Sequence, residues 1–112
     1  MIEIILIDYL KETLNVPVFT EEQSECYDKY IVIEKTGGDT ENFISTATVA
    51  IQSYANSLYE AALLNKQVKE AMKNIVALDN VSKSKLNSDY NFTDTTKKQY
   101  RYQAVYDLVF FD

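Results

Sequence analysis

The sequence has no histidine and a single cysteine, Cys26, among its 112 residues. Histidine is the usual general base and metal ligand at neutral pH, because its unperturbed pKa lies close to that pH. A zinc site built from cysteine and histidine is therefore excluded, and one cysteine cannot close a disulfide within the chain. Acidic neighbours are expected to raise the pKa of the Cys26 thiol, which disfavours a reactive nucleophile.

Glycine and proline are also scarce, with two and one residues respectively. So few of these residues argue against a disordered or loop-built chain. The pair Gly37-Gly38 lacks the flanking residues of a phosphate-binding loop, and no serine stands in a nucleophile-elbow motif. From these absences we predict that the protein is not an enzyme and that it needs no cofactor or metal.

Basic residues are outnumbered, with 11 Lys and Arg against 17 Asp and Glu, and the formal net charge is −6. This balance disfavours duplex DNA as a ligand, because phosphate binding depends on Lys and Arg. The acidic residues Glu21, Glu22, Glu25 and Asp28 could together hold a hard cation, but we interpret them as a solvated loop.

Long hydrophobic runs are missing as well, since no apolar stretch approaches the roughly 20 residues that span a bilayer. The N-terminal residues 1–12 are interrupted by Glu3 and Asp8 and lack the basic start of a signal peptide. We therefore expect them to belong to the fold, and we expect an intracellular protein without a membrane partner.

What the sequence does contain is one highly patterned stretch, residues 44–78. Its first third alternates, with Ala47, Val49 and Ile51 on one side, which is the period of a strand with one buried face. From about residue 56, apolar residues recur three and four positions apart, which is typical of one helix face. These residues are Ala61, Leu64, Val68, Ala71, Ile75 and Leu78. A strand thus leads almost directly into a long amphipathic helix.

Patterning elsewhere predicts one more helix and four more strands. The helix covers residues 2–15, and the strands cover 16–20, 30–35, 81–90 and 101–111, with a turn at 36–42 and an exposed loop at 91–99. The Gly37-Gly38 pair is expected to supply positive φ values in that turn. The order α-β-β-β-α-β-β predicts a single α+β domain over residues 1–112. We expect a two-layer sandwich of two helices on one face of a mixed or antiparallel sheet of four or five strands.

The face of the central strand opposite the core is expected to carry a polar row of Thr46, Thr48 and Gln52. Tyrosines are expected to add amphipathic rings to the surface: Tyr54, Tyr59, Tyr90, Tyr100, Tyr102 and Tyr106. Tyrosine is enriched at protein interfaces because it buries area while keeping a polar tip. The alternative is that several of these rings simply fill the core and its rim.

Three segments together resemble the tail terminator proteins of long-tailed bacteriophages and prophages. The first is an early helix followed by VPVF at residues 16–19. The second is TATVAIQSYANSLYEAALLNKQVKEAM, a strand passing into a helix. The third is KQYRYQAVYDLVF near the C-terminus. The likeness covers most of the chain.

The resemblance implies a structural protein that assembles as a homo-hexameric ring on the finished tail tube. Such a ring ends polymerisation of the tube protein, presents a surface to the head–tail connector and leaves a channel through which DNA passes without specific binding. It implies no catalytic residue, assembly in the host bacterial cytoplasm, and a final location in the virion tail. The alternatives are another head–tail joining (neck) protein, or a small α+β module that binds a ligand or adds a peptide strand. An enzyme that uses carboxylates alone ranks last.

A ring needs two different contact patches on each subunit. We expect the loops at residues 36–42 and 91–99 to contact neighbouring subunits or the tube. The residues chosen for this interface are Gly37, Gly38, Asp39, Glu41, Asp94, Lys97 and Lys98. A net charge of −6 per subunit, if spread into the channel, is expected to keep DNA from adhering.

Overall fold

The computed structural model describes residues 2–23 and 27–111. Within these ranges the chain forms two α-helices, one short 3-10 helix and five strands. In chain order they are α1 (Ile2–Leu14), β1 (Val18–Phe19), β2 (Lys29–Glu41), β3 (Ile44–Ala55), α2 (Leu58–Asn74), the 3-10 helix η1 (Ile75–Ala77), β4 (Val81–Asn91) and β5 (Tyr100–Phe111).

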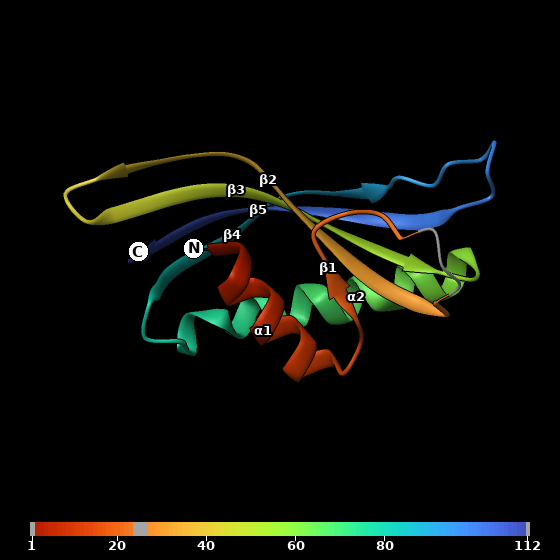
Figure 1. Cartoon of the computed structure of the whole chain (residues 1–112), viewed down its shortest axis with the longest axis horizontal. Coiled ribbons are helices and arrows are strands. Elements are labelled where there is room, and N and C mark those ends of the chain that lie inside the picture. The colour runs from red at the N-terminus through yellow and green to blue at the C-terminus, as the bar shows by residue number, and fades with distance from the viewer. Residues whose placement is uncertain (1, 24–26, 112) are drawn as a thin grey trace.

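The five strands form one sheet in the order β1-β2-β3-β5-β4. The short β1 runs parallel to β2, and every other pairing is antiparallel. Both helices lie on the same face of this mixed sheet, with α2 against β3 and β5 and α1 against β2 (Figure 1). The predicted α+β fold is therefore confirmed.

Helix α2 begins at a capped end and buries the predicted stripe as far as Ala71. The predicted helix continued to Leu78, but Ile75 lies buried in η1 and Leu78 lies beyond it and is half-buried. The Ser57 side chain accepts a hydrogen bond from the backbone N–H of Glu60 at 3.2 Å, which satisfies one of the free donors of the first turn. Ala61, Leu64 and Val68 are at most 1% exposed. Burial of this stripe against the sheet fixes the position of the helix.

Helix α1 covers the rest of the inner face through residues spaced four apart. Ile2, Leu6 and Leu10 are buried in the same core as α2. The helix ends where Asn15 adopts a left-handed conformation (φ 55°) and its N–H bonds the Lys11 carbonyl at 3.0 Å. Asparagine tolerates this conformation well, so the helix has a regular C-terminal cap.

The turn predicted at residues 36–42 is wrong, because β2 continues in an extended conformation to Glu41. Neither Gly37 nor Gly38 has a positive φ. The chain reverses instead at Asn42 and Phe43, whose φ values are 52° and 66°, between the paired residues Glu41 and Ile44. Two central residues with positive φ define a type I′ hairpin turn.

Gly38 allows two strands to approach closely beside a bulge. The register between β2 and β3 shifts between Lys35 and Gly37. A Cβ atom at Gly38 would lie 2.7 Å from the backbone oxygen of Thr46, whereas one at Gly37 would meet nothing within 4 Å. Glycine in a strand often marks such a bulge or close approach.

The two glycines therefore predict opposite responses to alanine. Gly38→Ala is expected to cost about 1–2 kcal/mol of unfolding free energy, because the Thr46 backbone must move away. Gly37→Ala is expected to be neutral or stabilising by up to about 1 kcal/mol, since the unfolded chain loses freedom. Urea unfolding of both variants measures the difference, and equal effects would contradict this account of Gly38.

The β2–β3 hairpin extends past the helices at one end of the molecule, which measures 44 × 24 × 22 Å (Figure 1). Every residue of β2 in the range 34–41 is exposed. The first predicted strand is short, because β1 contains only Val18 and Phe19 and pairs with Ile31 and Val32 of β2. At the other side of the sheet β4 is an edge strand.

Candidate protein interface

The loops predicted to touch neighbouring molecules lie at opposite ends of the sheet. In the β3–β5 ladder, Ile44 pairs with Phe111 at one end and Ala55 pairs with Tyr100 at the other. The Asn42–Phe43 turn therefore lies at the first end and residues 92–99 lie at the second (Figure 1). The structure does not bring the two sets of predicted residues together within one subunit.

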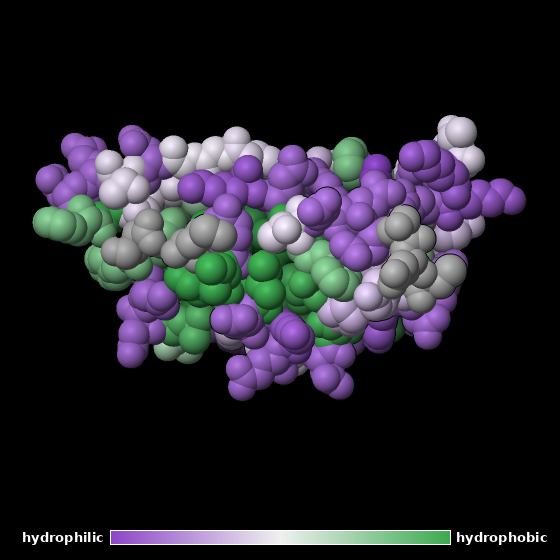
Figure 2. Space-filling view, in the orientation of Figure 1, coloured by the Kyte–Doolittle hydropathy of each residue, from purple (hydrophilic) through white to green (hydrophobic). Residues whose placement is uncertain are grey.

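The first end, which we call the hairpin tip, comprises residues 39–44 and combines acidic with hydrophobic side chains. Asp39 and Glu41 are exposed there, as predicted. Phe43 is 88% exposed and Ile44 is 45% exposed. Figure 2 shows hydrophobic side chains beside hydrophilic ones at this end, whereas the opposite end is mainly hydrophilic.

Sequence reasoning missed Phe43, although it is the most exposed of the large hydrophobic residues at the tip. The available signal was the two-residue turn Asn42-Phe43 between alternating strands, where Asn-Gly is the preferred sequence. The nearby Gly37-Gly38 pair attracted the turn prediction instead. Gly37 and Gly38 therefore belong to the strand that carries the tip, and Asp39 and Glu41 flank the turn itself.

At the second end, residues 92–99 form a tight reversal that is organised by Asp94. The backbones of Asp94 and Gln99 exchange two hydrogen bonds of 3.0 Å. The Asp94 carboxylate accepts from the N–H of Thr96 at 3.0 Å and of Lys97 at 3.2 Å. Asp94 therefore builds the turn, while Lys97 and Lys98 present their exposed side chains to solvent.

A cavity of about 270 Å³ opens beside this reversal, and we call it the tyrosine pocket. Its lining includes Tyr27, Tyr30, Tyr54, Tyr100, Lys97 and Lys98. The rings come from three strands and the segment before β2, so the pocket exists only once the sheet has formed. Tyr30 and Tyr54 are buried, so the aromatic surface it offers comes from the partly exposed rings of Tyr27 and Tyr100, next to two positive charges.

The floor of the tyrosine pocket is rigidly packed. Tyr30 and Tyr54 stack with ring centroids 4.5 Å apart and planes 6° apart. Arg101 donates to the Tyr54 hydroxyl at 2.9 Å, and its guanidinium lies 4.5 Å from the Phe92 ring centroid. Burial raises the pKa of both Tyr30 and Tyr54.

Two of the tyrosines predicted to face outward are buried. Tyr54 is 3% exposed in a second small cluster with Tyr30 and Val32, and Tyr106 is 4% exposed in the main core. Tyr59, by contrast, is 76% exposed. Tyr54 is covered by Tyr30 and Val32 of the neighbouring strand β2, whereas Tyr106 points into the main core that the helices share.

Gln52 was also expected on the surface and is only 8% exposed. Its amide donates to the Gln103 side-chain oxygen at 2.8 Å and its own oxygen accepts from the Tyr54 hydroxyl at 3.1 Å. Gln103 in turn donates to the Tyr90 hydroxyl. The predicted polar row therefore exists only at Thr46 and Thr48, and Gln52 belongs to a buried hydrogen-bond chain.

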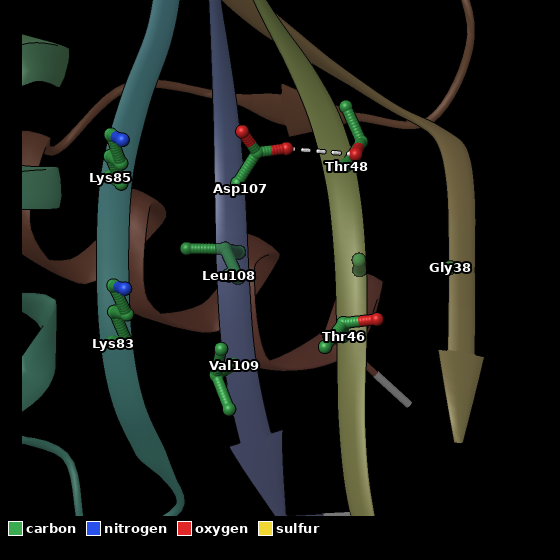
Figure 3. A pocket seen from close by; sticks show the side chains of 9 residues that line it. Gly38, Thr46, Thr48, Lys83, Lys85, Asp107, Leu108 and Val109 are labelled. Carbon is green, nitrogen blue, oxygen red and sulfur yellow. Dashed lines mark hydrogen bonds between the residues drawn. The ribbon is translucent and has the colours of Figure 1, made fainter. Parts of the chain in front are cut away.

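A shallow groove of about 340 Å³ crosses the helix-free face of the sheet (Figure 3). Thr48 donates to Asp107 at 2.9 Å, and Lys83 and Lys85 lie alongside on β4. Hydrogen bonds from Asn87 and Thr48, with the positive charge of Lys85, lower the pKa of Asp107. An aspartate that stays ionised is a poor general acid at neutral pH, so this groove offers charge and hydrogen bonding to a contacting surface.

The remaining predictions concern a metal site and a membrane-spanning segment. In the described ranges 2–23 and 27–111, no group of three or more His, Cys, Asp or Glu side chains is placed to hold a metal ion. Glu25 and Cys26 lie outside those ranges. Over the same ranges, no helix has the length and hydrophobicity to cross a membrane.

Comparison of the sequence with protein-family models and with curated proteins gives no match. A fold of this kind does not define a function, which has to be argued from a site. In this chain the two ends of the sheet carry the most distinctive exposed chemistry.

Proposed function

We propose that this chain is a structural assembly protein whose copies join head to tail into a ring. One observation carries the proposal, which is that the two ends of the elongated sheet are chemically different and complementary. The hairpin tip presents Asp39, Glu41 and the exposed Phe43. The opposite end presents Lys97 and Lys98 beside the tyrosine pocket.

Different patches at opposite ends favour a head-to-tail contact rather than a two-fold one. A two-fold contact uses the same patch on both subunits, whereas a head-to-tail contact joins unlike patches and closes into a ring when the rotation permits. Like charges would oppose each other if two tips or two lysine-rich loops met, and this disfavours the two-fold arrangement.

The resemblance to tail terminators gives this ring a biological setting. In that setting a hexamer of the chain caps the tail tube of a long-tailed phage or prophage and ends tube polymerisation. Its partners are the tube protein and the head–tail connector, and DNA passes through the central channel. The net charge of −6 per subunit supports passage without specific binding, because it repels phosphate.

The purified protein is expected to form a discrete hexamer of the 12.9 kDa chain, either alone or on tail tubes of its own phage or prophage. Light scattering measures the mass, and electron microscopy of tubes grown with and without the protein shows whether their ends are capped. A protein that stays monomeric at every concentration and leaves tube growth unchanged would contradict the proposal.

A second candidate is a module that binds an extended peptide as an added strand, and one observation favours it. Within the described residues, β1 pairs only with Ile31 and Val32, so the outer edge of β2 beyond them has no partner strand. An edge of this kind is the usual site of strand addition. Two results together would support this candidate over the ring. The protein would have the mass of a monomer, and addition of a peptide would slow amide hydrogen exchange over residues 34–41.

A further inference from the structure

Four residues other than glycine have a positive φ in the described part of the chain: Asn15, Asn42, Phe43 and Lys98. Asparagine adopts this conformation readily, so the first two need no special reason. Phe43 and Lys98 are the unusual pair. One lies at the hairpin tip and the other in the reversal beside the tyrosine pocket.

Phe43 combines an unfavourable backbone with an unfavourable exposure. Its position in a type I′ turn is one that glycine normally fills, and a bulky residue there is an outlier. Phe43 is 88% exposed, so its packing within the subunit contributes almost no stabilisation. Strain that the fold does not need tends to mark functional positions. We therefore expect the ring to be buried by another molecule.

The same chain carries a cavity suited to this ring. The tyrosine pocket has a volume of about 270 Å³, and its lining includes the partly exposed rings of Tyr27 and Tyr100. Aromatic rings favour edge and offset contacts with one another. Lys97 and Lys98 on the pocket lining complement Asp39 and Glu41 beside Phe43. The tip and the pocket lie at opposite ends of a 44 Å molecule, so they meet only between copies.

We propose that Phe43 of one copy inserts into the tyrosine pocket of the next, with Asp39 and Glu41 facing Lys97 and Lys98. This contact rests on the proposed ring and names the surfaces that close it. The occupant is a second copy of this chain because both halves of complementary charge are present on one subunit.

The first test replaces Phe43 with residues that suit a left-handed turn. Phe43→Gly and Phe43→Asn are expected to weaken self-association at least tenfold, since a central aromatic anchor is lost. As a dissociated subunit, each variant is expected to melt at a temperature no lower than the dissociated original protein does, because the strain in the backbone at residue 43 is relieved. Sedimentation velocity gives the association, and thermal unfolding at low concentration gives the stability.

Leu86→Thr is the matched control, since Leu86 is 42% exposed but lies in the middle of β4, away from both ends. It is expected to leave association unchanged. If it weakens association as much as Phe43→Gly does, or if Phe43→Gly lowers the melting temperature, Phe43 has no dedicated docking role and the proposal is overturned.

The second test reverses the charges of the two halves. Asp39→Lys with Glu41→Lys, and Lys97→Glu with Lys98→Glu, are each expected to abolish self-association. An equimolar mixture of the two variants is expected to restore a ring in which they alternate, because the positive tip of the first variant fits the acidic loop of the second and the acidic tip of the second fits the lysines of the first. Combining all four changes in one chain is expected to restore the ring, which a general loss of folding could not explain.

These experiments can contradict the docking contact without contradicting the proposed ring. A ring that forms equally well with Phe43→Gly and with the charge reversals would overturn the docking contact and leave the ring intact. An unmodified protein that stays monomeric with and without tail tubes would overturn both.

Discussion

Leu64→Ala is expected to lower the free energy of unfolding by about 3 kcal/mol, within a range of about 2–5 kcal/mol. Leu64 is 1% exposed and lies on the face of α2 that packs beneath β3 and β5. Truncation to alanine loses the transfer free energy of the buried carbons and leaves a cavity that a close-packed core fills only partly. In a domain of this size, that is a large part of the total stability.

The adjacent Leu63→Ala is the matched control, because it removes the same side chain from a position that is 44% exposed. Its loss is expected to stay below about 1 kcal/mol, since alanine also has the better helix propensity. Urea unfolding followed by circular dichroism measures both variants. Equal losses at positions 63 and 64 would show that α2 does not present its predicted face to the sheet.

Raising the pH from 10 to 12 is expected to destabilise the fold by about 2 kcal/mol through Tyr106 alone. Burial, and to a smaller extent the Asp89 carboxylate, raise the pKa of Tyr106 from 10.0 to about 12. Between these values the unfolded chain releases the phenol proton while the folded chain keeps it. The stabilisation is therefore complete below pH 10 and is lost as the pH rises through 12.

Tyr106→Phe removes the ionisable group and is expected to flatten the dependence of unfolding free energy on pH in that range. Tyr59→Phe changes a 76% exposed ring and is expected to keep the full dependence. Denaturant unfolding at a series of pH values compares the two variants with the original protein. Because Tyr9, Tyr30 and Tyr54 also have raised pKa values, some alkaline loss persists in Tyr106→Phe. Identical slopes for all three proteins would refute the assignment to Tyr106.

The sequence alone determined which faces of β3 and α2 are buried. Ala47, Val49 and Ile51 alternate, and the Ala61 and Leu64 stripe follows a helical period, as the structure confirms. This information is local, because the period of apolar residues sets the face that each element presents to the core. The same local information predicted the exposed loop at residues 91–99, most of which is exposed in the structure.

Only the tertiary structure decided the purpose of Gly38 and the position of the turn. A glycine pair serves a turn or a close approach equally well. The choice depends on the backbone oxygen of Thr46 in the neighbouring strand β3, which a Cβ at Gly38 would approach to 2.7 Å. The burial of Tyr54 was decided in the same way, by strands that pair with its own. The separation of the tip and the tyrosine pocket to opposite ends of the sheet is likewise set by the β3–β5 register, a pairing between distant segments that local periodicity does not encode.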